Sequence, residues 1–451
     1  MGNQLECNNR YFKFIDDNVA SIMKNSSELA NSFRSTAIDQ FKKLGIPSVK
    51  EEIYKYSNLA TVFDYDYKSY FKPSKEDLME ASKFECDVND LDTHSIILVN
   101  GYYPDPVRLK ALPEGIIVGS LDEAMRTHSD IVEKHFNKYT QNDKDGLLAL
   151  NTAMASDGIF IYVPDNVIAN KPIQIVNIIQ SSVDTFNQHR NLIVLGKNAS
   201  MTMIICDHTL SPQKFLTNAV TEIYVDQNSK FDIIRIQNEH NNAGKITHTF
   251  IHQERDSVAL SNNITLHGGF IRNNTYHYLC GEGAETHSNG LYLCDKFQHV
   301  DNYVSVDHLV PKCSSDQLYK GVLDEMSTGA FNGRIYVHKD AQGTNAFQRN
   351  NNILMTDDAK INTKPHLEIY ADDVKCSHGA TVGQLNEEML FYLRSRGISL
   401  HEAKMLLMFA FSHEVIQNIE VEALRERLDN LVMQRLRGEL SPCASCMVKC
   451  G

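Results

Sequence analysis

The stretch GIFIYVPDNVIANKPIQIVNIIQ (residues 158–180) opens the part of the chain whose pattern decides the fold. It holds two short runs rich in β-branched residues, and Pro, Asn and Asp separate them as turn residues do. The runs NLIVLG (191–196) and MTMIIC (201–206) continue this pattern, and similar runs recur roughly every 10 to 18 residues as far as Val382. The sequence therefore predicts a long domain made of β-strands.

Two architectures fit such a rhythm. One is a sandwich or barrel, and the other is a parallel β-helix, in which each coil buries its face against the next. The array runs for about 225 residues with no helical interruption, which is long for one sandwich. Asparagine, which tolerates left-handed turn geometry and can hydrogen-bond between coils, is frequent where we expect corners. These residues are Asn262, Asn263, Asn273, Asn274, Asn332, Asn350, Asn351, Asn352 and Asn362. Although no strict repeat is visible, both features favour the β-helix.

Helical patterns flank this β domain. Residues 1–157 are predicted to form a mainly helical N-terminal domain, in which Phe33, Ala37 and Phe41 have helical spacing up to Gly45. Leu121–Lys138 and Gly146–Met154 also have helical spacing, whereas Ile96–Asn100 and Gly115–Val118 are strand-like. The β domain itself is assigned to residues 158–383.

Residues 384–438 predict a C-terminal domain of three helices. The first ends at Gly397, and Ser399 with Glu402 forms a capping box for the second. The third ends at Gly438, and residues 439–451 form a cysteine-containing tail. The apolar positions of the three helices are Leu385, Met389, Leu390 and Leu393, then Leu406, Leu407, Ala410, Phe411, Val415 and Ile419, then Leu424, Leu428, Leu431 and Leu436.

Composition excludes several classes of protein. The 451 residues carry a net charge of −13, which argues against a general binder of nucleic acid or of anionic membranes. No apolar run approaches the roughly 18 residues that span a bilayer, and the N-terminus lacks a signal-peptide core. We therefore expect a cytosolic protein whose ten cysteines are reduced thiols. The chain has no GxxxxGK[ST], HExxH or GxSxG sequence, which argues against ATP hydrolysis, zinc-protease and α/β-hydrolase chemistry.

Chemistry-bearing residues occur in LEIYADDVKCSHGATV (367–382). In a strand, Cys376 and His378 share a face with Val374, Ala380 and Val382, so a thiol and an imidazole lie on an otherwise apolar surface. The alternative is a packed cysteine and a hydrogen-bonded core histidine. Two ligands are too few for a closed metal site, although a second chain could supply the others.

Two further groups of residues are weaker candidates. Cys443, Cys446 and Cys450 have CxxCxxxC spacing, which suits zinc or an iron–sulfur cluster but equally a tail with exposed thiols. His248 and His252 would share one face of a strand, and the alternative for them is surface or turn histidines.

The segment NTKPHLEIYADDVKCSHGATVGQLNEEMLFYLRSRGIS (362–399) resembles the C-terminal signature of SufD proteins, which belong to the SufB/SufD family of iron–sulfur cluster assembly. DGIFIYVPDNVIANKPIQI (157–175), FNGRIYV (331–337) and NNNILM (350–355) are also similar to that family. EEIYKYSNL (51–59) resembles its N-terminal motif, although Tyr54 stands where the family usually has tryptophan. The resemblance covers nearly the whole chain in the right order.

This resemblance implies a mainly β fold, namely a right-handed parallel β-helix between helical terminal domains. It implies a heterodimer with SufB through the last β-helix strands. It also implies docking of the ABC-type ATPase SufC on the C-terminal helices, with Leu390, Leu393, Leu406, Leu407 and Phe411 as contact positions. His378, with Cys376 as a secondary candidate, would bind iron or a transient iron–sulfur cluster beside a SufB cysteine, with no cofactor tightly bound in the isolated chain.

A different class of function is a β-helix lyase or hydrolase acting on carbohydrate. That class is usually secreted and has exposed aromatic residues and clustered carboxylates in a groove. The absent signal-peptide core and the absence of tryptophan count against it. The exposed terminal strand of a β-helix also makes a homodimer of the isolated chain plausible.

Overall fold

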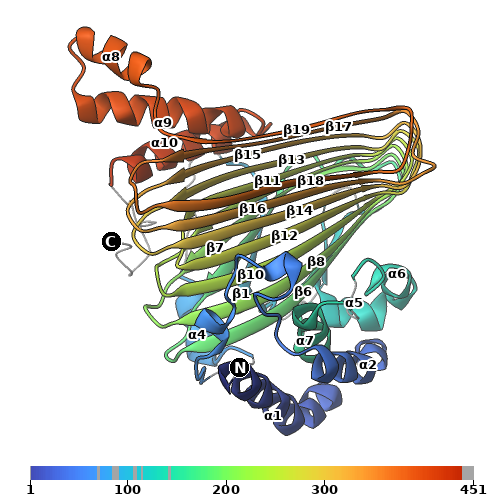
Figure 1. The fold of residues 1–451 in the computed structure, drawn as a ribbon. Coiled ribbons are helices and arrows are strands. Elements are labelled where there is room, and N and C mark those ends of the chain that lie inside the picture. Colours follow the sequence, from blue (N-terminus) through green and yellow to red (C-terminus); the bar gives the residue numbers. More distant parts are fainter. Residues whose placement is uncertain are drawn as a thin grey trace.

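The computed structural model describes residues 2–68, 72–83, 91–104, 109–112, 115–140 and 144–438. Strands form the centre of the molecule, and helices gather at two places around it (Figure 1). The N-terminal helices are α1 (Gly2–Asn25), α2 (Glu28–Leu44), η1 (Glu52–Tyr54), α3 (Ala60–Phe63), α4 (Lys75–Ala81), α5 (Leu121–Thr127), α6 (Ser129–His135) and α7 (Gly146–Met154). The C-terminal helices are α8 (Glu387–Ser395), α9 (Leu400–Ile416) and α10 (Glu422–Leu436).

The strands form two sheets. Odd-numbered strands make the first, which we call the odd sheet, in the order β1 (His94–Val99), β5 (Ile173–Ile179), β7 (Ser200–Thr209), β9 (Lys230–Asn238), β11 (Val258–His267), β13 (Glu285–Cys294), β15 (Ser314–Leu323), β17 (Thr344–Leu354) and β19 (Val374–Gly383). The second, the even sheet, contains β18 (Lys360–Ile369), β16 (Thr328–Val337), β14 (His299–His308), β12 (Phe270–Leu279), β10 (Ala243–Gln253), β8 (Phe215–Val225), β6 (Thr185–Leu195), β4 (Ile159–Val163), β3 (Ile117–Ser120) and β2 (Leu109–Ala111).

The chain alternates between these sheets, so each coil contributes one strand to each. Thr185 of β6 pairs with Phe215 of β8, which sets that coil at 30 residues (215 − 185). Among the described residues, pairings between named strands are parallel except those of β2 with β3 and of β3 with β4, and one isolated antiparallel bridge joins Val99 to Tyr102. The prediction of a parallel β-helix is therefore confirmed, and the sandwich alternative is wrong.

The asparagines that we expected at corners lie elsewhere. All nine are within strands, and some of them link successive coils; for example, Asn289 Nδ2 donates to Asn262 Oδ1 at 3.1 Å. The corners instead use Asn166, Asn198 and Asn228, whose φ angles are 62°, 54° and 58°. Side-chain amides of these three residues also link successive coils, at 2.8 and 3.1 Å. Inside the solenoid, an asparagine in a strand can form hydrogen bonds through both its side-chain carbonyl oxygen and its NH₂ group. Composition alone therefore could not distinguish asparagines in strands from asparagines at corners.

The N-terminal region covers one end and part of one face of the solenoid. The helix expected around Phe33–Leu44 is α2, and Gly45 ends it with φ 69°. The strand-like segments are β1 and β3, which extend the two sheets. The helix expected over Leu121–Lys138 is instead two helices, since His128 leaves helical geometry at φ −132° and ψ 40°.

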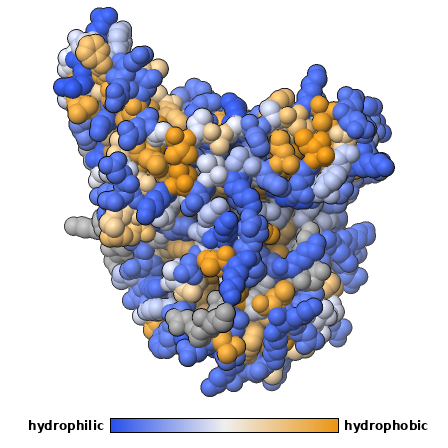
Figure 2. All heavy atoms as spheres, viewed as in Figure 1, coloured by the Kyte–Doolittle hydropathy of each residue, from blue (hydrophilic) through white to orange (hydrophobic). Residues whose placement is uncertain are grey.

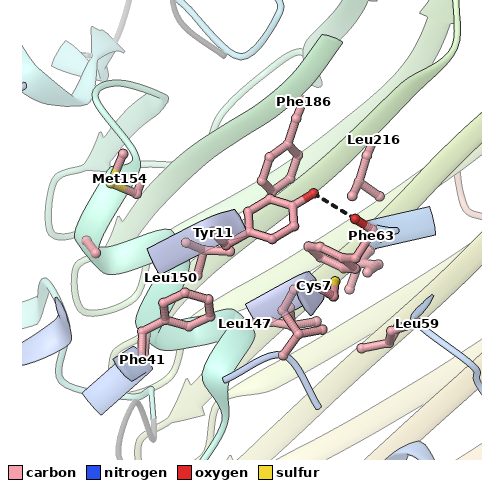
Figure 3. Close-up of a cluster of buried hydrophobic side chains, with 14 of the residues drawn as sticks. Cys7, Tyr11, Phe41, Leu59, Phe63, Leu147, Leu150, Met154, Phe186 and Leu216 are labelled. Atoms are coloured by element: carbon pink, nitrogen blue, oxygen red, sulfur yellow. Dashed lines mark hydrogen bonds between the residues drawn. The ribbon is translucent and has the colours of Figure 1, made fainter. Parts of the chain in front are cut away.

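Aromatic packing joins these helices to the solenoid. Tyr11 and Phe63 both meet Phe186 of β6 edge to face, with ring centroids 5.8 Å apart in each pair (Figure 3). Tyr11 Oη also donates to the Phe63 carbonyl at 3.3 Å. Farther along the solenoid, Tyr54 Oη donates to Asp145 at 2.6 Å, and the Arg272 guanidinium lies 4.2 Å from the Tyr54 ring centroid. The N-terminal helices and the even sheet therefore share one core.

The interior between the two sheets, which we call the lumen, changes character along the solenoid. Near the N-terminal end it is aliphatic, with Ile161, Ile193 and Ile205 in one buried cluster. Further along it holds buried charge, such as Lys245 Nζ at 2.6 Å from Asp207 Oδ1. Toward the C-terminal end it becomes rich in amides.

The C-terminal helices fold back on the odd sheet. Met405, Met408 and Val415 of α9 pack with Leu291 and Leu318 of β13 and β15. Ser399 caps α9 by accepting from the Glu402 amide at 3.1 Å, which is one of the two hydrogen bonds of the predicted capping box. By contrast, α8 has no buried residue and projects from the body (Figure 1). None of the helices in the described ranges combines the length and apolarity needed to cross a membrane.

Candidate functional site: the open end of the solenoid

The two ends of the solenoid differ in how they are covered. At the first end, β1 and the antiparallel strands β2 and β3 complete the sheets beside the N-terminal helices. At the second end, β18 and β19 are the outermost strands of the even and odd sheets. No described element pairs with their free edges. These edges therefore offer backbone hydrogen-bonding groups to another chain.

Cys376 and His378 both lie on β19, at this open end. Cys376 pairs in register with Ala346 and is half-buried against a cluster containing Val337 of the even sheet. Since that cluster spans both sheets, the Cys376 side chain faces the lumen. His378, two residues further, projects to the same side and is exposed. The structure thus does not bury His378 as a core histidine.

The coil beneath this pair is largely polar. Val374, Cys376, His378, Ala380 and Val382 stack in register on Thr344, Ala346, Gln348, Asn350 and Asn352. Four of these five supporting residues are polar, and all five are buried. The sequence pattern missed Gln348 because its place under His378 depends on the register between strands 30 residues apart.

The chain alone offers an incomplete ligand set. No group of three or more His, Cys, Asp or Glu side chains that could hold a metal is found in the described part of the chain. Burial raises the pKa of the Cys376 thiol, which disfavours the thiolate that binds iron. The pair can therefore supply one imidazole and one thiol but cannot enclose a metal ion.

The predicted docking positions are distributed over a hairpin formed by α8 and α9. Leu390, Leu393, Leu406, Leu407 and Phe411 are all half-buried. Leu393 and Leu407 line a cavity of about 350 Å³ with Met389 and Tyr392, which are 56% and 57% exposed. Phe391 of α8 is 76% exposed. Figure 2 shows hydrophobic side chains on these projecting helices.

Phe411 has a different role from the other four positions. Lys320 of β15 donates from Nζ to the Phe411 carbonyl at 3.1 Å, and this Nζ lies 4.3 Å from the Phe411 ring centroid. Lys320 also forms an ion pair with Glu414. Phe411 thus helps to hold α9 against the solenoid.

The remaining candidates do not form a ligand set. His248 is fully buried in β10, which corrects the expectation of a surface or turn histidine, and burial lowers its pKa to about 4. His252 instead contacts Glu254 Oε1 at 3.1 Å and Cys280 Sγ at 3.4 Å. Cys443, Cys446 and Cys450 lie outside the described residues. The described cysteines, Cys7, Cys206, Cys280, Cys294, Cys313 and Cys376, are free thiols.

A groove on the even sheet provides the test of carbohydrate chemistry. Its cavity of about 360 Å³ is lined by aromatic residues such as Tyr276 and by the carboxylates of Asp307 and Glu368. Arg334 forms ion pairs with both of these carboxylates, at 3.0 and 2.7 Å. In this groove the two carboxylates are therefore held by one cation and do not stand as an unpaired cluster.

Comparison with known proteins identifies the family to which the chain belongs. Residues 177–411 match the model of the SufBD core domain of the SUF system for iron–sulfur cluster assembly, and residues 5–175 match the SufBD N-terminal region. The chain therefore belongs to the SufB/SufD family of iron–sulfur cluster assembly proteins.

Individual relatives point to the SufD branch. The chain is 30% identical to the iron–sulfur cluster assembly protein SufD of Escherichia coli, over 89% of this chain and 92% of that protein. It is 25% identical to SufD of Bacillus subtilis, over 90% and 94% of the two chains. A SufBD-family protein of a Synechocystis strain is 28% identical, over 92% and 90%.

Proposed function

We propose that this chain is a non-catalytic scaffold subunit for iron–sulfur cluster assembly, which pairs with a SufB-like protein through the open end of its solenoid. The observation that carries the proposal is the exposure of a lumen-facing histidine, His378, on β19, one of the two strands whose outer edges are unpaired in the described chain. Every earlier coil is covered by the next. This last coil is left for a second solenoid to cover.

The incomplete ligand set supports such pairing. Cys376 and His378 offer two ligands, whereas a tetrahedral site of the kind that thiolates and imidazoles form needs four. A partner solenoid meeting β19 would bring its own last coil against them. We therefore propose that His378, with Cys376 beside it, binds iron or the nascent cluster as cargo together with a cysteine of the SufB-like partner.

The α8–α9 hairpin supports docking of a second partner, the SufC-like ABC ATPase. No residue of α8 is buried, and its Met389, Phe391 and Tyr392 side chains are 56%, 76% and 57% exposed, as the apolar side chains of a recognition surface would be. ATP hydrolysis would belong to that partner, because this chain has no phosphate-binding loop. We expect the assembly to work in the cytosol.

Anaerobic reconstitution with the SufB-like and SufC-like partners tests this function. Wild type and His378→Ala are compared for complex formation by size-exclusion chromatography and for cluster yield by absorption spectroscopy. We expect His378→Ala to form the complex and to lose most of the cluster signal. Wild-type cluster yield from this variant would remove His378 from the site.

A matched control variant distinguishes the role of the β19 strand edge from the role of the His378 side chain as a ligand. Ser377→Ala changes the next residue of β19, whose side chain points away from the lumen, and should leave both complex formation and cluster yield unchanged. Size-exclusion chromatography of the isolated chain shows whether it forms a homodimer. Failure of the wild-type chain to bind a SufB-like protein would contradict the scaffold function.

A further inference from the structure

The residue under His378 carries an unpaired acceptor. Gln348 of β17 is 1% exposed, and its Nε2 donates to Gln317 Oε1 of β15 at 2.8 Å. Its other amide atom, Oε1, is buried and has no hydrogen-bond partner among the described residues. A buried amide oxygen without a partner costs about 1–3 kcal/mol, so a donor should exist in the working state.

The position of this amide inside the lumen is well defined. A Cβ atom added at Gly333, on the opposite even sheet, would lie 2.3 Å from Gln348 Nε2. Gly333 therefore leaves room for an amide that reaches across the lumen. In the structure, Gln348 Nε2 points down the column of stacked side chains, where it donates to Gln317 Oε1. Oε1 is then the atom left for other donors.

The nearest donor on the next coil is His378. His378 and Gln348 are directly paired in register, so their backbones lie about 4.8 Å apart and their side chains stack on the same side. The other lumen-facing residues of β19 (Val374, Cys376, Ala380 and Val382) include no side chain with an N–H or O–H group. His378 is therefore the member of this face that can satisfy Gln348 Oε1.

We propose that Gln348 is a positioning residue for His378, whose imidazole N–H donates to Gln348 Oε1. The hydrogen bond itself follows from the positions of the two side chains, and only its use in orienting a metal ligand rests on the proposed function. A neutral imidazole has one N–H and one lone pair. Holding the N–H toward the lumen directs the lone pair out of the open end, where iron would be bound. Metal-binding histidines commonly use a carbonyl oxygen in this way.

The imidazole tautomer tests this contact directly. A chain labelled with ¹⁵N-histidine contains 18 histidines, and His378 is assigned by the signals that His378→Ala loses. At a pH where the ring is neutral, wild type should hold His378 largely in one tautomer. Gln348→Met removes the acceptor and should shift the ¹⁵N signals toward those of free imidazole. Gln348→Glu keeps an acceptor and should restore the wild-type tautomer, since the unpaired Gln317 Nε2 can then donate to it.

A distant amide serves as the control. Gln237 of β9 is also fully buried and hydrogen-bonded in the lumen, and Gln237→Met should leave the His378 tautomer unchanged. In the reconstituted complex, Gln348→Met should lower cluster yield about 10- to 100-fold, as loss of other such supporting contacts does. Wild-type ¹⁵N signals for His378 in Gln348→Met would overturn the inference. A shifted tautomer, combined with full cluster yield from His378→Ala, would keep the contact and overturn the proposed function instead.

Discussion

The two ends of the solenoid are built from the same repeating coil but differ in how far other elements cover them. The first end has an aliphatic lumen and is closed by added strands and by helices that share its aromatic core. The second end has a lumen of amides, and its last coil is half-buried or exposed along almost its whole length. The difference shows that one end of the solenoid is closed by the chain's own strands and helices, whereas the other end is left uncovered.

The largest effect on stability is expected at the closed end. Phe186→Ala removes the ring that Tyr11 and Phe63 both contact, and it should lower the free energy of unfolding by about 3–5 kcal/mol. Denaturant unfolding followed by circular dichroism measures this loss. A change below about 1 kcal/mol would show that the N-terminal helices contribute little to closing the solenoid.

A smaller, pH-dependent effect is expected where the C-terminal helices meet the odd sheet. Burial, with the Glu420 carboxylate nearby, raises the pKa of Asp232 to about 7. A carboxyl group whose pKa is raised in the folded state does not destabilise the fold below its unfolded pKa of about 3.9. The protein then loses stability as the pH rises through the pKa of the folded state. Asp232→Asn should therefore match wild type near pH 4 and be more stable at pH 8, by up to about 4 kcal/mol. A stability difference that is constant with pH would contradict this assignment.

Two variants of the α8–α9 hairpin should distinguish effects on folding from effects on docking of the SufC-like partner. Leu407→Asp places a charge in the cavity that it lines with Leu393, so we expect a lower melting temperature together with weaker binding of the SufC-like partner. Phe391→Asp, at a residue that is 76% exposed, should weaken binding and leave the melting temperature within about 2 °C. Isothermal titration and differential scanning calorimetry measure the two quantities. Normal binding by Leu407→Asp with a normal melting curve would show that this surface is not the docking site.

The smallest effect on stability is expected at the open end. His378→Ala removes an exposed side chain from the last coil together with the donor proposed for Gln348 Oε1, and the free energy of unfolding should fall by about 1 kcal/mol. This variant gives the clearest contrast between the two ends, because it should lose most of its cluster yield while its stability changes little. A large loss of stability would instead make His378 part of the fold.

Sequence alone was sufficient for the features that depend on local pattern. The β-branched runs, the cap at Ser399 and the end of α2 at Gly45 follow from residue chemistry at short range. The sequence also placed Cys376 and His378 on one face of one strand. It could not show that Asn350 and Asn352 lie in a strand, or that Gln348 supports His378, because both depend on which residues 30 positions apart become neighbours.

The fold-back of the C-terminal helices has a consequence for synthesis on the ribosome. The closed end and the first coils emerge first and can fold as a template for each later coil. β19 emerges next, and only afterwards do α9 and α10 appear and pack onto β11, β13 and β15, which were made much earlier. The last translated segment therefore clamps the middle of the solenoid, and a truncated chain that lacks it exposes an apolar sheet face. A chain truncated before α9 should therefore be prone to aggregation through this uncovered apolar face.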